Sequence, residues 1–388
     1  MVEAVRRGRS QRSVAREFHV SLRTVQKWVV RAEGRRLDRV DFSTRPSRPG
    51  RVARKTDHVI ERQILQLRSE LREQSALGEY GAAAIRRHLV DVGGVSASSV
   101  PSTRTINRIL ERNGVFDGKR RVRRPAPPVG WYLPDACQRR AEIDSMDLVE
   151  GLALKGGIQI EVLNIISVHG GVVNSWPHSG STPASMVVER LLEHWRQFGL
   201  PSYAQFDNDT RFQGPHQHRD VISRVMRLCL SLGVTPVFAP PREHGFQNAI
   251  ESFNGRWQAK VWLRFDHDSE EALVDASHRY IVAVRQRSVA RTDAAPKRRP
   301  FPTTWRLDLQ KHPRGTIIYL RRASEQGRVE LLGRTFDVST DWPHRLVRCE
   351  VDLRARRIRI YGLRRQQHRV QPLLIEHAYQ LPKRPFQE

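Results

Sequence analysis

The feature that most constrains this chain is a set of acidic residues placed at the ends of apolar patterns. A short run of alternating apolar residues ends at Asp207, and a helical pattern further along carries Glu251 in its first turns. Upstream, another strand-like run contains Asp144 and Asp147. Carboxylate oxygens are the ligands that hard divalent cations prefer. We therefore expect strands and a helix to bring three acids together around a pair of metal ions.

The pattern between residues 136 and 295 predicts one α/β domain. Strand-like segments come first, a helix follows, and strands and helices then alternate. The expected strands cover 142–148, 158–168, 172–176, the run that ends at Asp207, and 235–238, and the expected helices cover 182–198, 221–232 and the segment around Glu251. This is the order of elements in an RNase H-like fold, in which the first and fourth strands are neighbours.

Two residues compete for the position of the first acid. The period of a strand places Ile143 and Ser145 on one face, and Asp144 and Met146 on the other. Asp144 follows an apolar residue in the middle of the run, whereas Asp147 lies nearer its end. We predict Asp144 as the first acid, with Asp147 as the alternative.

The residues around the other two acids form recognisable motifs. Asp207 and Asn208 are followed by Phe212 in the pattern Asp-Asn-x-x-x-Phe, and Glu251 lies in the pattern Asn-x-x-Glu-x-Phe. Both motifs resemble those of the integrase-core (DDE) transposases of bacterial insertion sequences and of retroviral integrases. The resemblance implies that Asp144, Asp207 and Glu251 are catalytic ligands of two Mg²⁺ or Mn²⁺ ions.

The resemblance also implies a reaction and its partners. A DNA transposase of this type is a polynucleotidyl transferase that nicks the transposon end and joins the freed 3′-hydroxyl to target DNA. Transposon-end DNA and target DNA are the expected partners, bound by a homo-oligomer. The sequence contains no Gly-rich loop of the kind that cradles nucleotide phosphates, so we do not expect use of ATP.

Certain positions depart from the family's pattern. Asp209 and Ala249 stand where the family usually has Gly, and Ser252 stands where it usually has Arg. These departures leave an alternative open, namely a catalytically inactive, domesticated transposase that acts as a sequence-specific DNA-binding or regulatory protein. An RNase H-like nuclease without strand transfer is a third interpretation, which two tandem DNA-reading modules would disfavour.

Polar residues near the acids have more than one interpretation. We expect Asn208 and Asn248 to support the metal ligands by hydrogen bonding. The alternative for Asn208 is a turn residue, and the alternative for Asn248 and His244 is a surface loop or a contact with DNA phosphate. The His-x-His pair formed by His216 and His218 has no further clustered ligand and does not predict a transition-metal site.

Residues 1–35 predict a helix-turn-helix module. The expected helices cover 11–18 and 22–29, with a turn between them, and the second resembles a recognition helix that enters the major groove. The alternative is a helical hairpin with a solvated basic face. In the second helix, the expected DNA contacts are Arg23, Thr24, Gln26 and Lys27.

Residues 56–116 predict a second helical domain of the winged or helix-turn-helix type. Its last helix, expected at 101–110, resembles a recognition helix and would direct Arg104 and Thr105 toward DNA. A net charge of +26 supports a polyanionic partner. Basic linkers are expected at 36–55 and 117–135, and in the second of these the expected phosphate contacts are Lys119, Arg120, Arg121, Arg123 and Arg124.

Residues 300–388 predict a small all-β domain. Short strands with basic alternate positions are expected at 315–320, 327–333, 334–338, 345–351 and 358–361. They resemble the SH3-like carboxyl-terminal barrels of related transposases, which implies a role in DNA binding or assembly. The expected basic surface of this barrel consists of Arg321, Arg322, Arg328 and Arg334.

Several classes of protein are disfavoured by what the sequence lacks. No apolar run approaches the length of a membrane span, and no signal-peptide pattern is present. Cys137, Cys229 and Cys349 are far apart and lack the spacing of a zinc site. We therefore expect a cytoplasmic, nucleoid-associated protein with reduced thiols.

Overall fold

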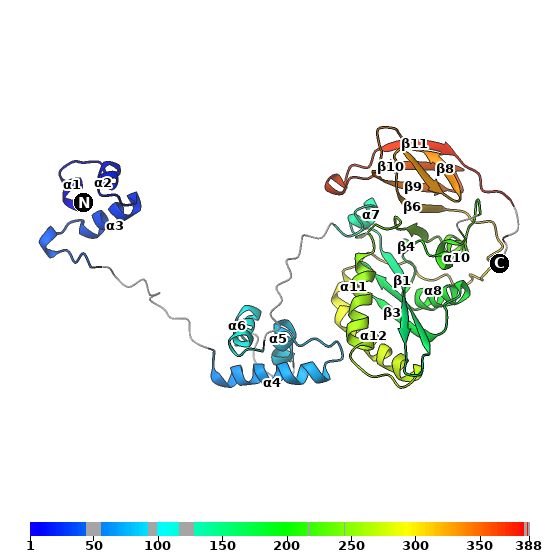
Figure 1. Cartoon of the computed structure of the whole chain (residues 1–388), viewed down its shortest axis with the longest axis horizontal. Helices are drawn as coiled ribbons and strands as arrows, with labels where there is room; N and C mark the ends of the chain where they lie inside the picture. Colours follow the sequence, from blue (N-terminus) through cyan, green and yellow to red (C-terminus); the bar gives the residue numbers. More distant parts are fainter. Residues whose placement is uncertain are drawn as a thin grey trace. The chain divides into compact units, whose positions relative to one another are not determined.

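The chain divides into two compact units, residues 1–58 and 59–388 (Figure 1). The computed structural model describes residues 1–43, 56–91, 99–115, 128–215, 218–243, 245–383 and 386. No helix within these ranges is long and apolar enough to cross a membrane. Some of the residues singled out above lie outside the described ranges, namely Lys119, Arg120, Arg121, Arg123, Arg124, His216 and His244.

The first unit is built from short helices with serine caps. Its helices are α1 (Val2–Arg6), α2 (Gln11–Glu17), α3 (Leu22–Ala32) and the 3₁₀ turn η1 (Leu37–Arg39). The hydroxyl of Ser10 accepts a hydrogen bond at the start of α2, and that of Ser21 does so at the start of α3. Val14 and Val25 are fully buried between these helices. The two helices predicted from the sequence are therefore present, and α1 precedes them.

The second unit begins with α4 (His58–Gln74), α5 (Ala82–Asp91) and α6 (Thr103–Arg112). Ile64, Ile85 and Ile106 come from the three helices and are buried against one another. Ser102 caps α6 by accepting a hydrogen bond from the Thr105 backbone N–H. The helical pattern predicted for this region is thus observed.

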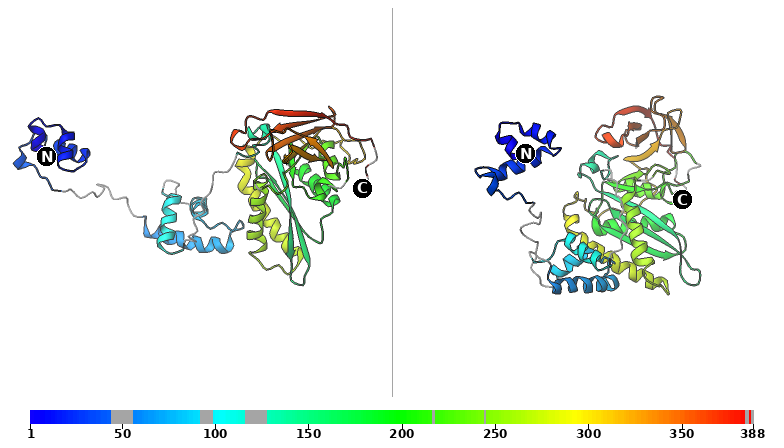
Figure 2. Two further views of the ribbon diagram at one scale, coloured as in Figure 1. Left: turned by 45° about the horizontal axis from the view of Figure 1, so that its top comes forward. Right: turned by 60° about the vertical axis from the view of Figure 1, so that its left-hand side comes forward.

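A mixed sheet with helices on both faces follows (Figure 2). Its first strands are β1 (Ile143–Ala153), β2 (Gln159–Ser167), β3 (Val173–Ser179), β4 (Tyr203–Phe206) and β5 (Thr235–Phe238). β1 pairs with β2 antiparallel and with β4 parallel, so the first and fourth strands are neighbours, as the RNase H-like order predicted. The short helices α7 (Pro134–Cys137) and α9 (Thr210–Gln213) lie just before β1 and just after β4 in the chain.

The two faces of this sheet are covered by different helices. Apolar residues of α8 (Ala184–Phe198) and α10 (Arg224–Ser231) share one core cluster with Met146 and Phe206. Apolar residues of α11 (Asn248–Trp257), the π-helical segment η2 (Gln258–Trp262) and α12 (Glu270–Asp293) share another cluster with Val149 and Val162. Neighbouring residues of β1 therefore face different helices, which decides where each of its carboxylates can reach.

The carboxyl-terminal strands are β6 (Thr316–Arg322), β7 (Arg328–Leu331), β8 (Arg334–Asp337), β9 (Leu346–Asp352), β10 (Arg357–Gly362) and β11 (Leu373–Ala378), with the 3₁₀ turn η3 (Arg365–Gln367) before the last. β6 pairs in parallel with β5, so the sheet continues from the core in the order β11-β10-β9-β6-β5-β4-β1-β2-β3. β7 and β8 form a separate hairpin. The sequence predicted an independent barrel after residue 300, whereas the structure joins most of these strands to the core sheet.

Candidate active site

Pairing between β1 and β4 places Asp147 beside Asp207. The last residue pair in the parallel register is Ser145 with Gln205, and each aspartate lies two residues further along the chain, Asp147 within β1 and Asp207 just after β4. Residues two apart on a strand point to the same face. Asp147, in the middle of β1, and Asp207, just after the end of β4, are therefore neighbours on one face of the sheet.

The helix that carries Glu251 packs on the same face of the sheet. Val149, two residues after Asp147, shares a buried cluster with Ile250 and Phe253 of α11. Glu251 is exposed in the first turn of this helix. Asp147, Asp207 and Glu251 therefore converge on one face, from two strands and a helix.

The pKa of Asp147 reflects the proximity of the other two acids. Burial, together with the negative charges of Asp207 and Glu251, raises the pKa of Asp147 to about 7. Burial likewise raises the pKa of Asp207, and the charge of Asp209 adds to that effect. Carboxylates that repel one another in this way are stabilised by a shared cation.

Asn254 is a site residue that the sequence analysis missed. Its amide donates a hydrogen bond to the Asp147 carboxylate at 2.8 Å, and its carbonyl oxygen accepts one from Asn164 at 2.9 Å. Asn254 lies three residues after Glu251 on α11, so helical periodicity places both on one side of the helix. That spacing was the signal in the sequence that could have found it.

Asp144 does not join the other acids, which corrects our prediction for the first acid. It is 1% exposed on the opposite face of β1, where Arg298 donates to its two oxygens at 2.7 and 2.6 Å. The indole N–H of Trp195 donates a third hydrogen bond at 3.0 Å. Although burial opposes ionisation, the Arg298 guanidinium holds the pKa of Asp144 well below its usual range. The structure thus favours the alternative, Asp147.

The residues after Asp207 form hydrogen bonds that hold the loop after β4 in place. The Asp209 backbone N–H donates to the Asp207 carboxylate at 3.0 Å, and the Asp209 side chain caps α9. Asn208 donates to the backbone carbonyl of Ala239 at 2.7 Å, which ties the loop to the end of β5. Asn208 therefore contacts the end of the neighbouring strand, while Asn248 is exposed at the first position of α11.

The departure at Asp209 is compensated by a nearby arginine. Arg211 donates to both oxygens of Asp209 at 2.8 and 2.7 Å. The same guanidinium reaches Glu150 at 2.6 Å and Glu161 at 3.2 Å. The negative charge that Asp209 brings to the loop is therefore paired with Arg211, whose positive charge opposes the effect of Asp209 on the pKa of Asp207.

The donor set fits hard divalent cations, which take oxygen ligands. Asp147, Asp207 and Glu251 supply carboxylate oxygens only, and the repulsion acting on Asp147 is what a bound cation would relieve. Within the described ranges, no group of three or more His, Cys, Asp or Glu side chains is already arranged to hold a metal ion. The three acids lie on one face of the sheet, and the charges of Asp207 and Glu251 act on Asp147. Their side chains would have to move to bind a cation together.

The predicted DNA-reading residues lie at corresponding positions in the two helical modules. Arg23, Gln26 and Lys27 are exposed on α3, and Arg104 is exposed on α6. Thr24 and Thr105 are half-buried, and each hydroxyl contacts the capping serine of its helix, Ser21 at 2.8 Å and Ser102 at 3.0 Å. Both helices thus begin with the pattern Ser-x-Arg-Thr followed by a buried apolar residue.

The sequence matches no protein-family model and no curated protein. Solved structures similar to the chain include an intasome of simian T-cell lymphotropic virus with the PP2A regulatory subunit B56 gamma, at 14% identity and a TM-score of 0.34, covering 66% of this chain and 81% of that chain. The catalytic core domain of BIV integrase is similar at 18% identity and a TM-score of 0.28, over 36% of this chain and 81% of that chain.

The HTLV-2 integrase catalytic core domain in complex with magnesium, in a dimeric form, is similar at 13% identity and a TM-score of 0.27, over 41% of this chain and 87% of that chain. All three TM-scores are low. The function proposed below is therefore based on the strand order and the acidic site of this chain itself.

Proposed function

We propose that this protein is a DNA transposase or integrase of the DDE type, which nicks DNA ends and joins the freed 3′-hydroxyl to target DNA. One observation carries the proposal: Asp147 lies beside Asp207 on the face of the sheet where α11 presents Glu251. The negative charges of Asp207 and Glu251 both raise the pKa of Asp147. The acids in this proposal are Asp147, Asp207 and Glu251, with Asp147 in place of Asp144.

The three acids would hold two Mg²⁺ or Mn²⁺ ions. Such ions, when bound, activate a hydroxyl for attack on a phosphodiester and stabilise the leaving oxygen. The chain's own contribution is to fix the ligands. Asn254 orients the Asp147 carboxylate, and the Asp209 backbone N–H orients that of Asp207. Ligands held by such hydrogen bonds lose less freedom when a cation binds.

The helical modules support a role in recognising DNA ends. The exposed residues Arg23, Gln26 and Lys27 on α3 and Arg104 on α6 are suited to contact bases or phosphates in a major groove. The proposed partners are transposon-end DNA and target DNA, bound by a homo-oligomer at the nucleoid, with no requirement for ATP. A net charge of +26 favours such polyanionic partners.

The test is a nicking and joining assay on the DNA segments that flank the gene. We expect products with Mg²⁺ or Mn²⁺ and none with EDTA. DNA binding without products under any divalent cation would instead favour the inactive, DNA-binding alternative. Nicking without joining to a second duplex would favour a nuclease of the RNase H-like type.

A further inference from the structure

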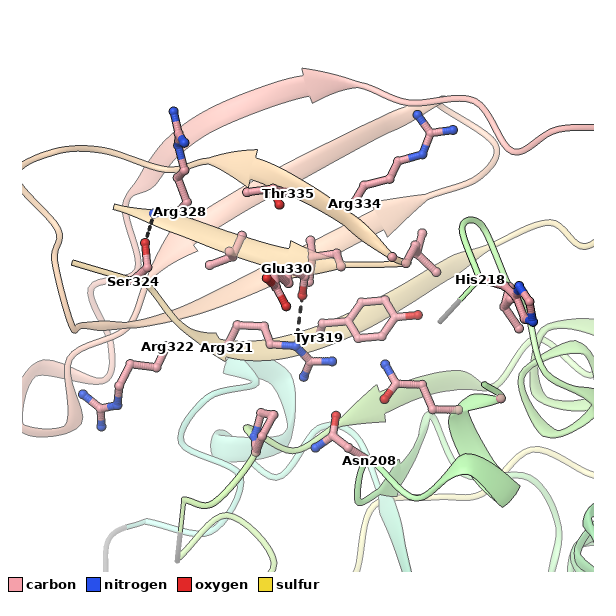
Figure 3. A pocket seen from close by; sticks show the side chains of 18 of the residues that line it. Asn208, His218, Tyr319, Arg321, Arg322, Ser324, Arg328, Glu330, Arg334 and Thr335 are labelled. Atoms are coloured by element: carbon pink, nitrogen blue, oxygen red, sulfur yellow. Dashed lines mark hydrogen bonds between the residues drawn. The ribbon is translucent and has the colours of Figure 1, made fainter. Parts of the chain in front are cut away.

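A cavity of about 910 Å³ lies next to the catalytic loop, between the core and the carboxyl-terminal strands (Figure 3). Asn208 and Gly214 line it from the core side, and β6, β7 and the β7–β8 turn line it from the other. Because Asn208 directly follows Asp207, the cavity adjoins the loop that carries Asp207. Its volume is within the range of about 300–1,000 Å³ that holds small ligands.

Arg321 supplies a buried positive charge to this cavity. Its side chain is only 9% exposed, and its guanidinium stacks over the Tyr319 ring at 5.0 Å. Its hydrogen bonds go to backbone carbonyls, those of Leu320 at 2.9 Å and of Glu330 and Ala239 at 3.4 Å. No carboxylate in the described part of the chain forms an ion pair with it.

A buried cation without an ion-pair partner is costly, because neutral carbonyls compensate only part of the lost hydration. Burial lowers the pKa of Arg321, and the attraction of Glu330, an exposed residue on the cavity wall, only partly offsets it. An anion placed in the cavity would complete the electrostatic environment of this guanidinium. The cavity is therefore suited to a negatively charged ligand.

The other arginines of the cavity differ from Arg321 in having carboxylate partners. Arg322 pairs with Glu243, Arg328 with Asp337 at 2.8 Å, and Arg334 with Asp220 at 2.6 Å. In Figure 3 the Arg321 guanidinium is turned toward Asn208, whereas Arg328 and Arg334 are turned away from it. Arg321 is thus the arginine directed at the catalytic loop.

Arg321 is also linked to that loop through a shared acceptor. The backbone carbonyl of Ala239 accepts hydrogen bonds from Asn208 at 2.7 Å and from Arg321 at 3.4 Å. The remaining walls of the cavity include apolar side chains such as Val221, Val329 and Leu331. A charged floor with apolar walls suits a phosphate that carries a sugar and a base better than it suits a bare ion.

We propose that this cavity binds an unpaired nucleotide of the DNA substrate, with its phosphate on Arg321 and its sugar and base against the apolar walls. The cavity has room for one or two nucleotides of a single strand, not for a duplex. The inference rests on the proposed function, because only a protein that acts on DNA would bring such a nucleotide to the Asp207 loop. It adds a site for single-stranded DNA to the acids that would act on the phosphodiester.

The experiment compares fluorescence anisotropy of two duplexes of the same arbitrary sequence, one blunt and one with a two-nucleotide single-stranded overhang, in EDTA. The full-length protein is expected to bind the overhang duplex about tenfold more tightly. Arg321→Gln should remove this preference and leave affinity for the blunt duplex unchanged. Arg328→Gln, which alters a cavity-lining arginine on β7 that is paired with Asp337, is the matched control and should keep the preference.

Competition with small molecules identifies the ligand chemistry. A 5′-phosphorylated thymidine dinucleotide should compete for the preference, whereas thymidine and inorganic phosphate should not. Equal binding of both duplexes by the wild type, or competition by inorganic phosphate as strong as that by the dinucleotide, would overturn the proposal. So would an equal loss on both duplexes in Arg321→Gln. Failure to bind either duplex would instead refute the proposed action on DNA.

Discussion

Asp144 and Asp147 lie three residues apart on β1, yet the two faces of the strand give them opposite properties. Asp144 faces α8, is 1% exposed, and is matched by the Arg298 guanidinium at 2.6 Å. Asp147 faces α11, where the nearby charges are those of Asp207 and Glu251. Both carboxyls are buried from water to a large extent, so burial alone does not decide their charge.

The sign of the surrounding charge makes the difference. On the α8 face, a cation is built into the chain, and the pKa of Asp144 is lowered despite its burial. On the α11 face, the acids face one another, and the pKa of Asp147 is raised to about 7. A carboxylate that is already paired with a cation of the chain stabilises the fold, whereas acids that lie together without one are suited to binding an external cation.

The largest expected effect is on catalysis. Asp147→Asn should reduce nicking and joining roughly 10³-fold, because a lost metal ligand costs several kcal/mol of transition-state stabilisation. DNA binding in EDTA should be retained. Asp144→Asn is the matched variant on the other face, and its folded fraction should keep activity. Full activity of Asp147→Asn, or an inactive but fully folded Asp144→Asn, would reverse the assignment of the two faces.

The second-largest expected effect is on stability and concerns Asp144, on the face of β1 that α8 covers. Arg298→Met leaves Asp144 as an uncompensated buried charge and should lower the free energy of unfolding by about 3–5 kcal/mol, measured by urea denaturation. Arg299→Met is the control, since the Arg299 side chain donates to the carbonyls of Leu232 and Gly233 and forms no ion pair within the described part of the chain. The loss there should be about 1 kcal/mol.

Adding Asp144→Asn to Arg298→Met should recover part of the lost stability, because the charge left without a partner is removed. Equal losses for Arg298→Met and Arg299→Met would show that the ion pair with Asp144 contributes nothing beyond ordinary hydrogen bonds. In that case a built-in ion pair would not distinguish the Asp144 face of β1 from the Asp147 face.

Part of this comparison could be predicted from the sequence. Alternation along β1 separates Asp144 from Ile143 and Ser145, and the strand order makes β1 and β4 neighbours. The alternation of residues along β1 does not predict which face of the sheet is covered by the helix that carries Glu251. That depends on the packing of α11 against Val149, a contact between residues about a hundred positions apart, and such packing has no local signal.

The hydrogen-bonding partners of the two aspartates also differ in whether they could have been predicted from the sequence. Asn254 follows Glu251 by three residues, so the helical period could have identified it. Arg298 lies 154 residues from Asp144, in a segment without periodic pattern, and nothing near either residue predicts the pair. The junction of β5 with β6 was missed for a related reason, because the open edge of a strand does not specify which strand will pair with it.

The third prediction concerns the pH dependence of stability without metal. Because the pKa of Asp147 is raised from 3.8 to about 7 in the folded state, the unfolded chain loses its proton first as the pH rises. Stability therefore falls between these pH values through this group. Asp147→Asn removes the penalty, so its gain in stability should grow from about pH 4 and become constant above about pH 7.

The size of this gain at pH 8 should be about 1–3 kcal/mol, after allowing for solvent screening of a half-buried group. Urea denaturation in EDTA at several pH values measures it. Asp144→Asn should show no gain at any pH, since the Arg298 guanidinium favours the ionised form of that carboxyl. A gain for Asp147→Asn that does not change between pH 5 and pH 8 would contradict the raised pKa.

The smallest expected effect distinguishes the hydrogen bond that orients Asp147 from the hydrogen bond that orients Asp144. Asn254 donates to Asp147 at 2.8 Å, and Trp195 donates to Asp144 at 3.0 Å. Asn254→Ala should lower the rate of nicking about tenfold, because a ligand that loses its orienting partner binds metal more weakly. Raising the Mg²⁺ concentration should recover much of that loss, which a purely structural defect would not allow. Trp195→Phe removes one donor from the other face and leaves a cavity in the core, which should lower stability. The rate of its folded fraction should equal that of the wild type at every Mg²⁺ concentration. If both variants lose activity equally, or if Mg²⁺ restores neither, then Asn254 serves the fold and not the acids, and the two faces of β1 are alike in function.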